Sequence, residues 1–285
     1  MATLVLLGGS LFWGLFWWPL KALAGGGLHG GFVQFAAYGL PALALLPWAW
    51  ASRAAWRNRL AVLLLIALLG GWANASFASA LAYGSVVRVM LLFYLAPVWT
   101  IVAARIALAE PITPLRLTAL ALALAGLGFT LGGPQLFEAP LGAVDLLALS
   151  SGLAFALNNV AIRATRELPE VVRSVAVFAG CATFSLGFMA WAGEGPPALD
   201  GVNALWLLGL GLLWVLPGTL ATYYGVARLE AGKAAILLLA ELVVGVVSAV
   251  LVGGEQFGLK EAVGGGLILA AAVLEARSEP QAVPA

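Results

Sequence analysis

Long apolar runs alternate with short polar or glycine-rich connections along the whole chain. A membrane span needs about 20 apolar residues, and lipid offers no partner to free backbone groups, so runs of this length predict helices that cross a bilayer. About ten such runs can be delimited. They are Ala2 to Ala24, Phe32 to Ala51, Leu60 to Leu81, Val86 to Leu108, Leu115 to Leu131, Gly142 to Ile162, Val172 to Trp191, Ala204 to Val226, Ala234 to Gly253 and Gly258 to Ala276. The expected fold class is an all-α integral membrane protein with about ten transmembrane helices.

Composition supports a membrane protein over a water-soluble one. Hydrophobic residues make up 63% of the 285-residue chain and charged residues only 9%, whereas soluble domains contain roughly 25% charged residues. The formal net charge is +1 and the pI is about 7.9, so there is no basic stripe for nucleic acid and no acidic tail for a basic partner. The partner that the composition predicts is the lipid bilayer, with no nucleic acid.

The first apolar run also fits a secretory signal peptide. Leu4 to Leu20 is apolar, and Ala22-Leu23-Ala24 resembles a cleavage site of small residues. No Lys or Arg precedes the run, unlike the basic start of a signal peptide. The internal repeat described below also needs this segment, so we expect it to be the first span.

Lys and Arg are concentrated in alternate connections, which predicts the orientation because cytoplasmic loops keep positive charge. One set contains Arg53, Arg57, Arg59, Arg105, Arg116, Arg163, Arg166, Arg173, Arg228, Lys233 and Arg277. The other set contains only Lys21, Arg88 and Lys260. Both termini are therefore expected in the cytoplasm.

The chain resembles itself at an offset of about 142 to 145 residues. The matched positions pair Lys21 with Arg163, Arg88 with Lys233, Pro97 with Leu242, and Glu110 with Glu255. Five helices per half is an odd number, so the second half would enter the membrane upside down. We expect two inverted five-helix repeats, residues 1–135 and 136–285, a common basis for alternating access. The competing explanation is that any two Ala/Leu-rich helices align by composition.

Several short motifs, in this order, resemble the drug/metabolite transporter superfamily. They are Trp13-Gly14 with Lys21, Leu95-Ala96-Pro97, and the loop acids Glu110 and Glu255. The resemblance covers essentially the whole chain and is nearest to EamA-like ten-helix exporters, among them bacterial exporters of aromatic amino acids. It implies an exporter of amino acids or similar metabolites in a bacterial inner membrane. Leu242 stands where a symmetric second proline would be, so no proline hinge is carried over to the ninth helix.

Glu241 is the sharpest candidate for a transport residue. It is the only ionisable residue from Ala234 to Gly253 and lies about 12 Å along its helix, near the midplane. Ionisable groups at that depth are costly and usually face a cavity. Glu241 suits either proton coupling or binding of a substrate ammonium group. The simpler alternative is a structural hydrogen bond to a neighbouring helix.

Amides within the spans are further candidates for substrate binding. Asn158 and Asn159 lie in the cytoplasmic half of the sixth helix, and Asn74 lies in the third. An amide can donate to a carboxylate and accept from an ammonium group. Adjacent helical positions point about 100° apart, so one of Asn158 and Asn159 is expected to face the cavity. Hydrogen bonds between helices explain these residues equally well.

Aromatic residues are abundant in the spans, and a cavity lined with them would suit planar, amphipathic solutes. Our candidates are Trp17, Tyr83, Tyr94 and Tyr223. Aromatic rings in membrane helices more often serve packing than binding. Pro97 and Pro217 lie near the middle of the fourth and eighth helices, where a missing amide permits a kink, so they are candidate hinges.

These features predict a secondary transporter that exports small amphipathic metabolites, above all aromatic or other neutral amino acids. The alternative within the superfamily is export of other metabolites or drugs. No Walker motif occurs, so no ATPase subunit is expected as a partner, and no cofactor or metal site is expected around the single Cys181. An intramembrane enzyme is disfavoured, because the only His is His29 in an outer loop and Glu241 is the one deep carboxylate. The inverted halves disfavour a passive channel or a scaffold.

Overall fold

The computed structural model describes residues 1–28, 30–84, 86–131, 140–252 and 258–277, and these residues form helices without any strand. His29, Glu255 and the side chain of Lys21, which the sequence singles out, lie outside the described parts. The glycine-rich connections at 132–134 and 253–254 lie outside them as well.

The first part of the chain forms helices that follow the apolar runs. In chain order they are α1 (Ala2–Gly14), α2 (Trp17–Gly25), α3 (Gly30–Ala51), α4 (Arg53–Trp56), the short 3-10 helix η1 (Arg57–Arg59), α5 (Leu60–Tyr83), α6 (Val86–Phe93), α7 (Ala96–Ala107) and α8 (Pro114–Leu131). The arginine-rich segment after α3 was expected to be a loop. It forms α4 and η1 instead, because three arginines and an alanine pair give it good helix formers.

The second part contains the remaining helices. They are α9 (Ala143–Ala164), α10 (Glu170–Ala192), α11 (Gly201–Leu208), the π-helix η3 (Gly209–Val215), α12 (Leu216–Arg228), α13 (Ala231–Leu238), α14 (Ala240–Leu251) and α15 (Leu259–Ala276). Polar residues set several of their ends. Asp145 accepts a hydrogen bond from the backbone N–H of Gly142 at 2.8 Å at the start of α9, and Asp200 accepts from that of Asn203 at 2.7 Å at the start of α11. Gly193, at φ 69°, ends α10 in the left-handed region that glycine favours.

Nine segments of the described residues are long and apolar enough to cross a membrane. The tenth run corresponds to α15, whose apolar part, Ala262–Ala276, is shorter. The prediction of an all-helical membrane protein is confirmed, with nine or ten spans according to how α15 is counted.

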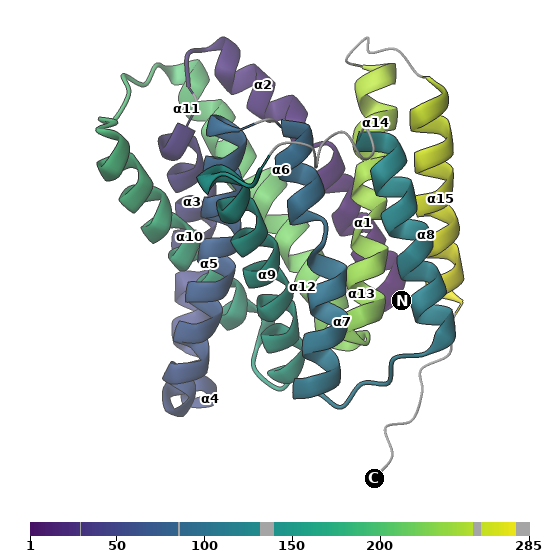
Figure 1. Ribbon diagram of the computed structural model, residues 1–285. Coiled ribbons are helices and arrows are strands. Elements are labelled where there is room, and N and C mark those ends of the chain that lie inside the picture. The colour runs from purple at the N-terminus through teal and green to yellow at the C-terminus, as the bar shows by residue number, and fades with distance from the viewer. Residues whose placement is uncertain (29, 85, 132–139, 253–257, 278–285) are drawn as a thin grey trace.

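The helices pack side by side into one bundle (Figure 1). On one side α10 packs against α3 and α5, and on the other α8 packs against α15, while α1 lies against α12 and α14. Small residues allow the closest approaches. A Cβ added at Gly180 of α10 would lie 2.0 Å from the carbonyl oxygen of Ala67 in α5, and one added at Gly126 of α8 would lie 2.6 Å from that of Gly264 in α15. Substitution of either glycine would push its helix pair apart.

Several spans were expected to be continuous helices and are in fact broken near their middle. The first breaks at Leu15–Phe16, the fourth at Tyr94–Leu95 and the ninth at Leu239. Pro97 lies in the first turn of α7, directly after the break, where an amide N–H would have no helical partner in any case. Pro217 has the same place in α12, after the π-helix η3. The ninth span breaks without a proline: the N–H of Leu239 donates to the carbonyl of Ile236 at 3.2 Å, a shorter loop than in an α-helix.

Candidate functional site

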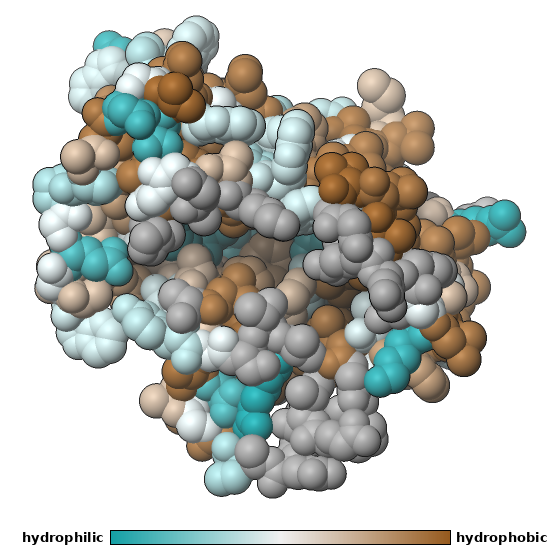
Figure 2. Space-filling model, turned by 90° about the horizontal axis from the view of Figure 1, so that it is seen from above, coloured by the Kyte–Doolittle hydropathy of each residue, from teal (hydrophilic) through white to brown (hydrophobic). Residues whose placement is uncertain are grey.

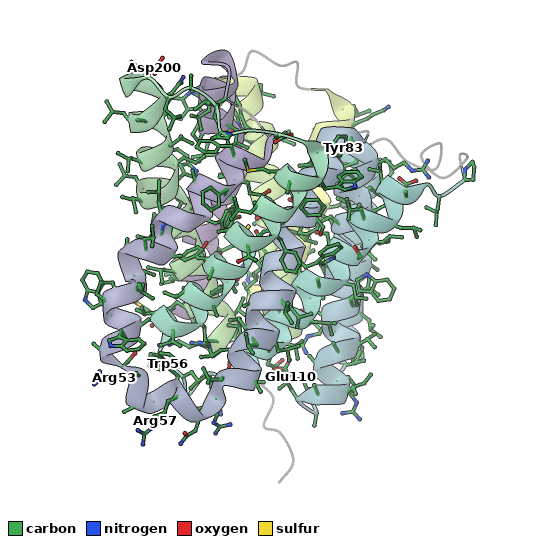
Figure 3. All side chains as sticks on the ribbon, turned by 90° about the vertical axis from the view of Figure 1, so that its left-hand side faces the viewer. Arg53, Trp56, Arg57, Tyr83, Glu110 and Asp200 are labelled. Atoms are coloured by element: carbon green, nitrogen blue, oxygen red, sulfur yellow. The ribbon has the colours of Figure 1, made fainter. Side chains whose placement is uncertain are left out.

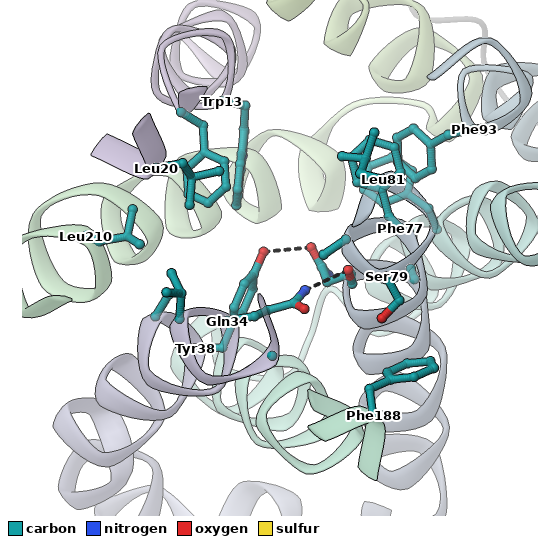
Figure 4. A pocket seen from close by; sticks show the side chains of 18 of the residues that line it. Trp13, Leu20, Gln34, Tyr38, Phe77, Ser79, Leu81, Phe93, Phe188 and Leu210 are labelled. Atoms are coloured by element: carbon teal, nitrogen blue, oxygen red, sulfur yellow. Dashed lines mark hydrogen bonds between the residues drawn. The ribbon is translucent and has the colours of Figure 1, made fainter. Parts of the chain in front are cut away.

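A cavity of about 510 Å³ lies among the helices and is lined mostly by aromatic and aliphatic side chains. Helices from both parts of the chain contribute to it. The aromatic residues that line it are Trp13, Phe16, Tyr38, Phe77, Tyr83, Phe93, Tyr94, Phe155, Phe188 and Tyr223. Its polar lining includes Gln34, Asn74, Ser79, Glu194, Thr219, Thr222 and Glu241. Figure 4 shows part of this lining.

The cavity opens toward the end of the bundle where Tyr83 lies. The Tyr83 side chain lines the cavity and is 58% exposed, and its ring packs edge-on against Trp191 at 6.4 Å. Figure 3 places Tyr83 and Asp200 at one end of the bundle and Arg53, Arg57 and Glu110 at the opposite end. Figure 2 views the Tyr83 end from above, where the surface is hollowed between the helix ends. The cavity mouth is therefore on the side away from the arginine-rich end.

Glu241 lines the cavity as part of a hydrogen-bonded pair with Tyr94. The phenol of Tyr94 donates to Oε1 of Glu241 at 2.7 Å. Tyr94 lies at the break between α6 and α7, and Glu241 lies in the first turn of α14, directly after the break at Leu239. The two helix breaks thus meet at one carboxylate. Among the described residues Tyr94 is the one hydrogen-bond partner recorded for Glu241.

Asn74 belongs to a group of polar side chains on α3 and α5 (Figure 4). Its Oδ1 accepts a hydrogen bond from the hydroxyl of Tyr38 at 2.8 Å, and its backbone oxygen accepts one from Nε2 of Gln34 at 2.7 Å. All three residues line the cavity. Gln34 and Tyr38 were not among the residues that the sequence singled out. Gln34 is the only amide in the apolar run from Phe32 to Ala51, and Tyr38 follows it by one helical turn, so a signal was present.

Asn158 and Asn159 are buried, each 1% exposed, and neither lines the cavity. Nδ2 of Asn158 donates to the hydroxyl of Tyr223 at 3.2 Å, and Tyr223 does line the cavity. Asn158 can therefore act on a solute only through Tyr223. The expectation that one of the two amides faces the cavity is not met, because the close packing of α9 against α5 and α7 encloses this part of the helix.

Trp17 does not line the cavity, whereas Trp13, one turn earlier, does. Nε1 of Trp17 donates to Oγ of Ser248 on α14 at 2.9 Å, and Nε1 of Trp13 donates to Oγ1 of Thr222 on α12 at 3.1 Å. The break at Leu15–Phe16 separates the two residues into different helices, so they do not share a face. From the first span, Trp13, Phe16 and Leu20 line the cavity.

Pro97 and Pro217 lie outside the cavity lining, each beside a helix interruption that borders it. Within the described part of the chain, no group of three or more His, Cys, Asp or Glu side chains is placed to hold a metal ion. Cys181 is buried within a hydrophobic cluster of α3, α5 and α10 residues. The cavity can thus offer aromatic faces, hydroxyls, amides and one deep carboxylate to a small molecule.

Comparison with known proteins agrees with this architecture. A family model described as the EamA-like transporter family matches residues 1–132 and 142–276. One solved structure, titled only as a crystal structure of a protein, superposes with a TM-score of 0.75 over 96% of this chain and 95% of that chain, at 20% sequence identity. At that identity the likeness concerns the fold alone. No protein with a curated description matches the sequence.

Proposed function

We propose that this chain, which belongs to the EamA-like transporter family, is a secondary transporter that exports small amphipathic metabolites, chiefly aromatic and other neutral amino acids, by alternating access. The family is one of transporters, and the described helices fit a multi-pass membrane protein. The substrate class, the inverted repeat, the orientation and the bacterial inner membrane belong to our proposal.

The observation that carries the substrate class is the Tyr94–Glu241 pair within an aromatic cavity. The cavity volume of about 510 Å³ lies within the 300–1,000 Å³ typical of small-molecule sites. A carboxylate attracts an ammonium group, and rings such as those of Trp13, Phe77 and Tyr223 offer faces and edges to an aromatic side chain. An amide such as that of Asn74 or Gln34 can donate to a carboxylate. Aromatic amino acids combine these three chemical features.

The bounds of two half-helices support the inverted repeat with halves 1–135 and 136–285. Adding 145 to the bounds of α6, Val86–Phe93, gives the bounds of α13, Ala231–Leu238. This offset also matches Arg88 with Lys233. The two half-helices end at the breaks that carry Tyr94 and precede Glu241. Such breaks at the contact of two repeats are where transporters of inverted design bind their solutes.

The arginines support an orientation in which the cavity faces away from the cytoplasm. Arg53, Arg57 and Glu110 lie at one end of the bundle and the exposed Tyr83 at the other (Figure 3). If the arginine-rich end is cytoplasmic, as the positive-inside rule predicts, the cavity opens outward. An outward-open carrier with a closed inner side corresponds to the state that releases an exported solute.

Counterflow in proteoliposomes tests the proposal. Vesicles are preloaded with unlabelled phenylalanine, labelled phenylalanine is added outside, and its accumulation is compared with that of labelled threonine and lysine. We expect saturable accumulation that prefers phenylalanine and that is lost in Glu241→Gln. A matched control is Glu194→Gln, which removes a carboxylate at the cavity mouth and leaves the Tyr94–Glu241 pair intact. The absence of counterflow with every amino acid would refute the substrate class.

A further inference from the structure

The half-helix α13 fills the space between the cavity and the arginine-rich end of the bundle. All of its residues, Ala231 to Leu238, are buried. Leu238, at its far end, lines the cavity. Its first residue contacts Glu110, which Figure 3 places at the arginine-rich end. A solute that left the cavity toward the arginine-rich end past Leu238 would therefore be blocked by α13.

Charged side chains from α8, from α9 and from the connection between α7 and α8 surround the start of α13. The carboxylate of Glu230, the residue before α13, forms an ion pair with the guanidinium of Arg116 on α8. The backbone N–H of Ala231 donates to Oε2 of Glu110 at 2.8 Å. Arg163 of α9 pairs with Oε1 of the same Glu110 at 3.5 Å. We call Glu110, Arg116, Arg163 and Glu230 the inner clamp.

Arg116 connects the clamp to the last helix as well. Its Nε lies 3.2 Å from Oε1 of Glu275 on α15, and its Nη1 donates to the carbonyl of Pro111 at 3.0 Å. The Arg116 side chain is 5% exposed and that of Glu275 is fully buried. A Cβ added at Gly232 would lie 3.0 Å from Cδ of Arg116, so the guanidinium stem packs directly on the first turn of α13.

The ion pairs of such a cluster contribute little net free energy to folding. Removing several charges from water costs most of what their attraction returns, so apolar side chains of similar size would often stabilise the fold equally well. Buried ion pairs are instead suited to a two-state contact, because the charges regain their hydration when the contact opens. The clamp connects the two proposed repeats, since Glu110 and Arg116 lie in the first and Arg163 and Glu230 in the second.

We propose that α13 is the inner gate of the carrier and that the inner clamp holds it shut. The inference rests on the proposed transport function and adds the regulation of the same cavity. The gate moves about the break at Leu239, where helical hydrogen bonding is interrupted directly before Glu241. Release of Glu230 and Ala231 from Arg116 and Glu110 frees the start of α13 and exposes the cavity to the cytoplasm. Because Glu241 follows the break, a ligand on its carboxylate acts on the same joint.

Sided thiol labelling tests the gate without any transported substrate. Ser79 lines the cavity, and the buried Cys181 is the only native cysteine. In a Cys181→Ala background, Ser79→Cys is exposed to a membrane-impermeant thiol reagent from either face of oriented vesicles. We expect the parent to react from the outer face. Arg116→Met should raise the rate of labelling from the inner face by at least about tenfold, because it leaves Glu230 and Glu275 without their guanidinium.

Two further variants keep the test decisive. Glu230→Gln preserves side-chain size and should also raise the rate of labelling from the inner face. It provides the test if Arg116→Met fails to fold. Arg228→Met is the matched control, because Arg228 pairs with Glu170 in a more exposed ion pair outside the clamp. It should leave inner labelling unchanged.

The outcomes separate the gate from the transport proposal. Unchanged inner labelling in folded Arg116→Met and Glu230→Gln would overturn the gate, as would an equal rise in Arg228→Met. Failure of counterflow in the parent, with the labelling pattern as expected, would overturn the proposed substrate class and leave the gate in place.

Discussion

The half-helices α6 and α13 (Figure 1) occupy matched places in the proposed repeat but differ in how far they are buried. Every residue of α13 is buried, whereas Arg88 and Met90 of α6 are partly exposed. Arg88 pairs with Asp145 at 2.8 Å, with both side chains more than 10% exposed. The start of α13 is held instead by the inner clamp, in which the Arg116 side chain is 5% exposed and that of Glu230 14%. The half-helix nearer the arginine-rich end is thus fully enclosed and its counterpart is not, which is the asymmetry that the proposed outward-open carrier needs.

The largest expected effect comes from removing the arginine at each end in turn. Arg116→Met should lower the free energy of unfolding by about 3–5 kcal/mol, because it removes the guanidinium that pairs with Glu230 and with the fully buried carboxylate of Glu275. Arg88→Met should lower it by about 1 kcal/mol or less, since its ion pair is in contact with solvent. Thermal unfolding of the two purified variants in the same detergent checks the difference. Equal losses of stability would contradict the contrast between the two ends.

The second prediction concerns the point where the two breaks meet. Glu241→Gln and Tyr94→Phe remove the charge and the hydroxyl of the pair, respectively. A hydrogen bond to a charged group contributes about 1.5–3 kcal/mol, so we expect Glu241→Gln to reduce phenylalanine counterflow about 10- to 100-fold. Tyr94→Phe keeps the ring and should cause a smaller loss. Initial rates in proteoliposomes measure both, and a larger loss in Tyr94→Phe would contradict a central role for the carboxylate.

The third prediction concerns the pH dependence of the inner clamp. Burial raises the pKa of Glu110 above its ordinary value of 4.5, and Glu230 adds to this, while Arg163, the N–H of Ala231 and Arg116 act in the opposite direction. An acid whose pKa is higher in one state binds its proton more tightly there, so falling pH favours that state. Acidification of the inner face, from about pH 7 toward about pH 5, should therefore stabilise the closed gate relative to a state with Glu110 in water.

Thiol labelling in the Glu230→Gln background, where the rate from the inner face is expected to be measurable, tests whether acidification closes the gate. The ratio of inner to outer labelling of Ser79→Cys should fall on acidification. Both faces are kept at the same pH in each measurement, so the ratio cancels the pH dependence of the thiol itself. Adding Glu110→Gln should remove the change. A ratio that rises as the pH falls would contradict the assignment to Glu110.

The smallest effect is expected at Ala109, directly before Glu110. Its φ of 55° lies in the left-handed region, which costs an L-residue with a Cβ about 1 kcal/mol. Ala109→Gly should relieve this strain and raise the stability by up to about 1 kcal/mol. Thermal unfolding measures the change, and inner labelling of Ser79→Cys serves as the control that the clamp remains closed. A loss of stability would show that this turn tolerates the left-handed conformation without strain.

The sequence predicted the spans because they follow from hydropathy along a single helix, and it singled out Glu241, which lines the cavity. It did not predict the break at Leu239, since no proline or glycine marks that position. It also preferred Trp17 to Trp13, because helical periodicity does not reveal that the first span is broken at Leu15–Phe16, although Gly14 precedes this break. Interrupted helices are decided by packing between spans, which a local pattern does not contain.

The inner clamp was also outside the reach of sequence reasoning. Arg116 and Arg163 counted as positive charges of cytoplasmic connections, and Glu110 as a loop acid. In the structure Arg116 and Glu110 are buried against Glu230 and Ala231, respectively. These partners lie more than 100 residues away along the chain, so no local sequence pattern shows the contacts. Charge counting gives the side of the membrane on which a residue lies, and tertiary contacts decide which charges pair there.

The most direct test of the account is the labelling of Ser79→Cys from each face in the Cys181→Ala chain without further change. A cavity that opens at the Tyr83 end and is closed by α13 predicts rapid reaction from the outer face and little or none from the inner face. Reaction at equal rates from both faces, or from the inner face alone, would contradict both the position of the gate and the outward-open orientation.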